Sequence, residues 1–130
     1  MKHLAAGILA ATLLAAAGSC SSSSGPVAGM LTVSLATPNP GTDGAILLTV
    51  AGPQALTSVT AGAGLRAFLQ PLSATTKVAL TGSLTSGAIL TIGVADVGQA
   101  TQYHATIQGV AASADFQLRP LAGYSLAVSR

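Results

Sequence analysis

Hydrolytic chemistry in this chain would have to use His104, the only histidine after the first 20 residues. In a catalytic triad, Asp96 or Asp115 would orient the imidazole and a serine would act as the nucleophile. The chain has no Gly-x-Ser-x-Gly sequence that would present such a serine. His104 alternates with the apolar Tyr103 and Ala105, so we expect a solvated surface histidine. We therefore expect that the protein is not an enzyme.

Carboxylate chemistry would depend on three acidic residues, all of them aspartates. They are far apart in the sequence, whereas a glycosidase needs a pair flanking the scissile bond. Asp43 and Asp96 lie in loop-like segments and could join backbone carbonyls in a calcium site, which takes roughly six to eight oxygens. Turn or capping roles explain both residues more simply. We expect no bound metal and no cofactor.

Few aromatic or cationic side chains are available to recognise a ligand. The chain has no tryptophan, and Tyr103 and Tyr124 each begin a strand-like segment. We expect their rings to pack and their hydroxyls to reach water or a backbone group, which leaves a glycan ligand with little support. Arg66 and Phe68 share a face and could form a small exposed patch, although burial of Phe68 in the core or beneath a loop is simpler. With Leu47, they form our candidate binding patch.

Cys20 is the only cysteine, and small residues precede it in the sequence Ala17-Gly18-Ser19-Cys20. Before them lie Lys2 and an uncharged, mostly apolar run over residues 4–17, which is shorter than the roughly 20 residues that span a bilayer. This segment resembles a bacterial lipoprotein signal peptide, although such sites usually have leucine where Ala17 stands. The resemblance implies cleavage after residue 19 and lipid on Cys20. An incidental thiol in a secreted protein is the alternative.

The lipoprotein resemblance also gives an expected domain organisation and location. Residues 1–19 would be the signal peptide, which forms a helix, and residues 20–26 a flexible serine-rich linker that carries the lipid on Cys20. Residues 27–130 would form one folded domain. The protein would then be anchored in the bacterial cell envelope, at the outer membrane or the cell surface rather than at the inner membrane.

Charged residues are sparse and make up 6% of the chain. After residue 20 the cations are Arg66, Lys77, Arg119 and Arg130, which are scattered along the sequence. The sequence pI of about 9.1 therefore reflects the scarcity of acids, and there is no basic stripe that could follow a phosphate backbone. These features exclude nucleic acid as an expected partner.

Alternation of apolar and polar residues between turn-rich segments predicts eight short strands. This spacing is typical of a single all-β antiparallel sandwich. In the segment 45–50, Ile46, Leu48 and Val50 should face the core and Leu47 the outside, where a loop or a partner would have to cover it. The predicted strands are 31–35, 45–50, 56–61, 65–70, 77–81, 88–94, 103–110 and 124–129.

The order of several segments is similar to cohesin-like domains and to the related sandwiches of carbohydrate-binding modules. The segments that carry this resemblance are the strand 31–35, the following Asn-Pro-Gly loop, the strand 44–50, Val59 and the segment 87–92. The resemblance implies a jelly-roll-like sandwich that binds a partner through a sheet face. None of that family's recognition positions can be matched here.

These features lead to one expected function and one alternative. We expect an exported, lipid-anchored, non-catalytic sandwich that acts as an interaction or structural module of the cell envelope and contacts an envelope protein. The alternative is a sandwich that binds a small ligand or a glycan, with or without help from calcium.

Overall fold

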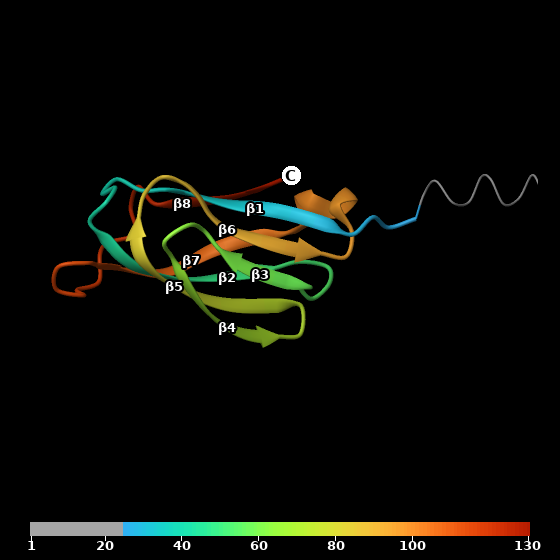
Figure 1. Ribbon diagram of the computed structural model, residues 1–130, viewed down its shortest axis with the longest axis horizontal. Coiled ribbons are helices and arrows are strands. Elements are labelled where there is room, and N and C mark those ends of the chain that lie inside the picture. Colours follow the sequence, from blue (N-terminus) through green and yellow to red (C-terminus); the bar gives the residue numbers. More distant parts are fainter. Residues whose placement is uncertain (1–24) are drawn as a thin grey trace, which may run out of the picture.

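The computed structural model describes residues 25–130, so the predicted signal peptide and Cys20 lie outside the described residues. Eight strands form two four-stranded sheets that pack face to face (Figure 1). The first sheet has the order β3-β6-β1-β8 and the second the order β4-β5-β2-β7. All neighbouring strands are antiparallel, which confirms the predicted β-sandwich. The strands are β1 (Gly29–Ala36), β2 (Asp43–Ala51), β3 (Ser58–Ala61), β4 (Arg66–Leu72), β5 (Thr75–Leu84), β6 (Gly87–Val94), β7 (His104–Ala112) and β8 (Ser125–Ser129).

Aliphatic side chains from both sheets fill the space between them. In β2, Ile46, Leu48 and Val50 are buried, while Leu47 on the opposite face is 44% exposed. The predicted register of this strand is therefore correct, because a shift of one residue would exchange the two faces. The other buried aliphatic residues are Leu31, Val33, Leu35, Val78, Leu80, Leu84, Ile89, Leu90, Ile92, Val94 and Val110.

A bulge in β7 changes which of its residues face the core. Leu48 pairs with Ile107 and Leu47 with Gly109, so that Gln108 has no partner in β2. An extra residue of this kind shifts the alternation of side chains along the strand. Beyond the bulge, Val110 is buried and Gly109 lies on the outer face beside Leu47.

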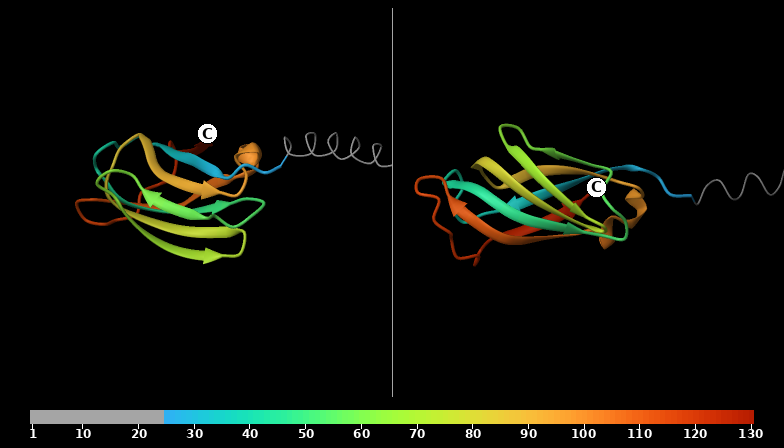
Figure 2. Two further views of the ribbon diagram at one scale, coloured as in Figure 1. Left: turned by 45° about the vertical axis from the view of Figure 1, so that its right-hand side comes forward. Right: turned by 90° about the horizontal axis from the view of Figure 1, so that it is seen from below.

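A short 3-10 helix, η2 (Val97–Gln102), joins β6 to β7 at the end of the sandwich where the described chain begins (Figure 2). Val97 N donates a hydrogen bond of 2.8 Å to Val27 O, which holds the segment before β1 against this helix. Tyr103 follows the helix and is buried over Gly52, where a Cβ atom would clash with the ring. The expectation for the Tyr103 hydroxyl is wrong, since it is buried without a hydrogen-bond partner in the described part of the chain.

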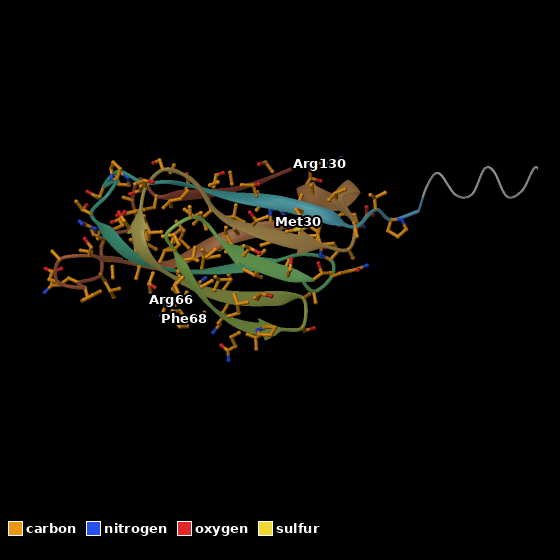
Figure 3. All side chains as sticks on the ribbon, viewed as in Figure 1. Met30, Arg66, Phe68 and Arg130 are labelled. Carbon is orange, nitrogen blue, oxygen red and sulfur yellow. The ribbon has the colours of Figure 1, made fainter. Side chains whose placement is uncertain are left out.

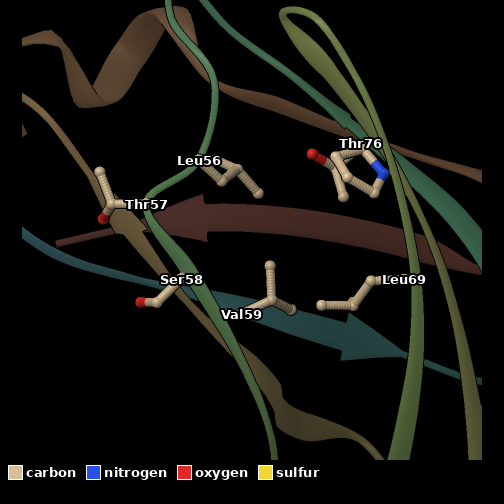
Figure 4. A pocket seen from close by; sticks show the side chains of 7 residues that line it. Leu56, Thr57, Ser58, Val59, Leu69 and Thr76 are labelled. Carbon is tan, nitrogen blue, oxygen red and sulfur yellow. The ribbon is translucent and has the colours of Figure 1, made fainter.

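The sandwich is open along the side where β3 and β4 form the sheet edges. A pocket of about 170 Å³ lies between the sheets here, and Leu56, Val59, Leu69 and Thr76 contribute to its lining (Figure 4). Leu69 belongs to the inward face of β4, opposite Val78, yet it is 48% exposed. The edge β4 therefore has apolar residues accessible from both of its faces. No helix among residues 25–130 is long and apolar enough to cross a membrane.

Candidate functional site

The outer face of the second sheet carries a row of apolar residues, one from each strand. Strand pairing places Phe68 beside Ala79, Ala79 beside Leu47, and Leu47 beside Gly109. Large and small side chains therefore alternate across the sheet. The small residues leave space above the backbone, so the side chains of Phe68 and Leu47 protrude from the sheet surface next to Ala79 and Gly109.

Two hollows follow from this alternation, one on each side of Leu47. A hollow of about 370 Å³ lies between Leu47 and Phe68 over Ala79, with Gln70 and Lys77 at its margin. A second hollow of about 430 Å³ lies between Leu47 and Leu118, and Gly109 contributes to its floor. We call these two hollows with Leu47 between them the outer-face groove.

Gly109 and Leu118 together shape the second hollow. Leu118 lies in the loop between β7 and β8 and pairs with Ala111 through an isolated bridge. A Cβ atom on Gly109 would lie 3.9 Å from Leu118 Cδ2, so the leucine extends over the glycine. Leu118 is 81% exposed. The sequence did not indicate Leu118 as a site residue, because it lies in a loop of irregular pattern.

The exposed charges on the four strands that carry the groove are positive. Arg66 and Lys77 are exposed and lie on the outer face of the sheet. The only acidic residue in the four strands is Asp43, whose side chain is buried. A partner with an apolar segment and acidic flanks would match this arrangement.

The structure places the candidate patch of Leu47, Arg66 and Phe68 on one face. Arg66 and Phe68 lie close together on the side formed by the second sheet (Figure 3). Phe68 is 55% exposed, so the interpretation of Phe68 as a core residue is wrong. β5 separates Phe68 from Leu47, which corresponds to about 10 Å because neighbouring strands are about 4.8 Å apart.

Asp43 is at the centre of a buried polar network rather than in an exposed loop. Arg119 Nε lies 2.7 Å from Asp43 Oδ1, and the side chain of Asp43 is 0% exposed. Tyr124 donates its hydroxyl hydrogen to Asp43 Oδ1 over 2.8 Å, and Thr37 Oγ1 donates to Oδ2 over 2.6 Å. The hydroxyl of Tyr124 thus reaches a carboxylate, instead of the expected water or backbone group. Since Arg119 already neutralises this carboxylate, the structure offers no support for calcium at Asp43.

The remaining polar candidates are engaged locally or lie on the surface. Asp96 caps η2 by accepting a hydrogen bond from Gly98 N over 2.9 Å, and Asp115 accepts one from Gln117 N over 3.1 Å. The capping role predicted for Asp96 is confirmed. His104 is exposed, as its alternation predicted. Within residues 25–130 no three His, Cys, Asp or Glu side chains gather as a metal site would require.

Compared with known proteins, the chain matches no family model, no curated protein and no solved structure. The outer-face groove is therefore argued from its own residues and geometry.

Proposed function

We propose that this protein is an exported, lipid-anchored and non-catalytic β-sandwich that binds an envelope protein through the outer-face groove. The observation that carries the proposal is Leu47, which is 44% exposed in the second sheet with hollows on both sides. An outer sheet face in contact with water ordinarily carries polar residues. An apolar residue in a hollowed apolar surface favours a binding role.

The shape of the groove supports a protein ligand over a purely structural role. The small residues Ala79 and Gly109 leave room for side chains of a partner on both sides of Leu47. Such a partner would insert apolar side chains and place acidic residues near Arg66 and Lys77. The resemblance to cohesin-like domains points to the same kind of contact, through a sheet face.

A charge introduced at Leu47 tests this binding role. Leu47→Asp should reduce recovery of the partner with the protein by at least about tenfold, because a buried unpaired carboxylate in the contact would cost more than 1.4 kcal/mol. Thr106→Asp is the matched control, since Thr106 is exposed on the same outer face, lies beside Thr49 rather than beside a cation, and does not line either hollow. Both variants should retain the unfolding midpoint of the parent. If both variants recover as much partner as the parent, the groove is not the binding surface.

The anchor is tested separately at Cys20. A Cys20→Ser variant should leave the membrane fraction, because a chain without lipid has no acyl group to insert. Equal retention of the parent and the variant in the membrane fraction would contradict lipid anchoring. This result would not affect the assignment of the groove.

Phe68 favours a second candidate function, the binding of a glycan or another small ligand. Its ring is 55% exposed beside a hollow of about 370 Å³, and an exposed ring can stack on a sugar face. A bound ligand would raise the unfolding midpoint, since binding to the folded state alone stabilises it. A panel of glycans, each tested with and without calcium, should then shift the midpoint of the parent and not that of Phe68→Ala. If no glycan shifts the parent, this candidate is rejected.

A further inference from the structure

The edge strand β4 ends the second sheet with unpaired backbone groups and an apolar surface. It has seven residues, of which Phe68, Leu69 and Leu72 are large, apolar and between 43% and 55% exposed. Exposed edges of this kind are templates for pairing with another strand, and proteins commonly protect them with charges, proline or bulges. In β4 only Pro71 and the charged Arg66 are protective residues of these kinds, and they lie near the two ends of the strand.

The turn between β4 and β5 determines which backbone groups point away from the sheet. Leu72 pairs with Thr75 across a turn of two residues, Ser73 and Ala74. The residues that flank such a turn form a hydrogen-bonded pair, and hydrogen-bonded and non-hydrogen-bonded pairs then alternate. Phe68 and Gln70 therefore bond to β5.

By the same alternation, the N–H and C=O groups of Ala67 and Leu69 point to solvent. Pro71 has the same orientation, which suits a residue that lacks an N–H group. The unpaired backbone groups of β4 are thus concentrated at Ala67 and Leu69, on either side of Phe68.

We propose that a second copy of this chain pairs with β4 in antiparallel orientation, about a two-fold axis at Phe68. Ala67 would lie opposite Leu69 of the second copy, and Leu69 opposite its Ala67, so that all four residues exchange hydrogen bonds. The two Phe68 rings would lie opposite each other, in a pair where side chains are closest. The second sheets of the two copies would then form one continuous sheet, with an outer-face groove on each side of the axis.

The residues on either side of the segment 67–69 determine the register of the proposed pairing. A shift of two residues in one direction would place Pro71 opposite Ala67, where its nitrogen has no hydrogen to donate. A shift in the other direction would place Leu65 opposite Leu69, but Leu65 N already donates to Gly62 O over 3.0 Å. Only the register centred on Phe68 pairs both the N–H and the C=O groups of Ala67 and of Leu69.

Side-chain pairing in this register favours a second copy over an unrelated strand. Arg66 would lie opposite Gln70 of the second copy, so no like charges face each other. On the inward face, Leu69 would lie beside Ala67 of the second copy and lose part of its exposure. The inference concerns how copies assemble, and it does not depend on the binding role of the groove.

The other edge strands are less suited to this pairing. β3 has four residues and β8 has five. β7 is longer, but Ala112 N and Val110 O bond to Gln117 O and Arg119 N in the following loop, which covers this end of its edge. β4 is therefore the edge that a second copy would use.

Disulfide trapping in the full-length chain tests the proposal. Residues opposite each other in a non-hydrogen-bonded pair have Cα atoms about 4.5 Å apart, within the range that a disulfide bridges. Phe68→Cys should therefore give a covalent dimer when cell lysate is oxidised with copper phenanthroline. Gln70→Cys is the control, because two copies of residue 70 would lie about 14 Å apart in this register. The parent, which retains Cys20, sets the background in every comparison.

A second trapping experiment combines two cysteine variants that both keep Phe68. Coexpressed Arg66→Cys and Gln70→Cys chains should form a heterodimeric disulfide, while neither variant alone should form a homodimer. Dimer from Phe68→Cys at or below the level of Gln70→Cys, or no heterodimer in the mixed experiment, would overturn the proposal.

The charge of residue 70 gives a second test of the register, because a negative and a positive side chain at this position should change the dimer yield in opposite directions. In the Phe68→Cys background, Gln70→Glu would face Arg66 of the second copy and should raise the dimer yield. Gln70→Arg would face the same cation and should lower it. Since each dimer contains two such pairs, the dissociation constants of the two variants should differ by about 2- to 30-fold. Equal yields would contradict the proposed register.

Discussion

Replacement of Arg119 by methionine should strongly destabilise the domain, because it leaves Asp43 as a buried carboxylate without its cation. Asp43 is 0% exposed, and Arg119 Nε is 2.7 Å from its Oδ1 atom. Removal of one partner from a buried ion pair costs about 3–5 kcal/mol. Tyr124 and Thr37 would still donate hydrogen bonds to the carboxylate, so we expect the lower end, about 3 kcal/mol. Such a loss is a large part of the roughly 5–15 kcal/mol that stabilises a domain.

Urea denaturation followed by circular dichroism measures this loss. Arg66→Met is the matched control, because Arg66 is exposed and forms no ion pair within residues 25–130. The control should change the free energy of unfolding by no more than about 0.5 kcal/mol. The double variant Asp43→Asn with Arg119→Met should be more stable than Arg119→Met alone, since it removes the buried charge. If Arg119→Met costs no more than Arg66→Met, the network does not stabilise the fold as argued.

Two further predictions concern the core and are measured by the same denaturation. Leu48→Ala should cost about 2–5 kcal/mol through lost apolar burial and the cavity that remains, whereas Leu47→Ala should cost less than about 1 kcal/mol because Leu47 is 44% exposed. Similar costs for both leucines would show that Leu47 packs into the fold rather than standing free for a partner. Tyr103→Phe should be neutral or stabilising, because the hydroxyl is buried without a hydrogen-bond partner among residues 25–130. A loss above about 1 kcal/mol would mean that this hydroxyl is hydrogen-bonded in solution.

Local alternation was enough to predict the eight strands and the two faces of β2. Period-two patterning is a property of neighbouring residues, and it directly reports which side chains share a face. It does not report which face is covered when both carry apolar residues. Phe68 and Leu69 illustrate this limit, since they lie on opposite faces of β4 and both are about half exposed.

Features that depend on distant residues could not be predicted from the sequence. The partners of Asp43 include Arg119 and Tyr124, which are more than 70 positions away and come from the last part of the chain. Asp43 therefore resembled an ordinary turn residue. The bulge at Gln108 also depends on pairing with β2, and without it Gly109 would have been assigned to the inner face.

The candidate site was only partly accessible from the sequence. Leu47 was identified because an apolar residue on the outer face of a central strand is unusual. Its hollows required knowledge of which small residues lie beside it across the sheet, namely Ala79 and Gly109. Leu118 reaches the groove from a loop, and no periodic pattern marks it.

Site-specific photo-crosslinking in living cells tests the central claim, that the outer-face groove binds a protein of the envelope. A photoreactive phenylalanine analogue at position 47 should give an adduct of discrete mass. The same analogue at position 127, which is exposed on β8 of the first sheet, should not give that adduct. An adduct with the mass of two copies would identify self-association at the groove instead of an envelope partner. No adduct from position 47, or the same adduct from both positions, would contradict the account.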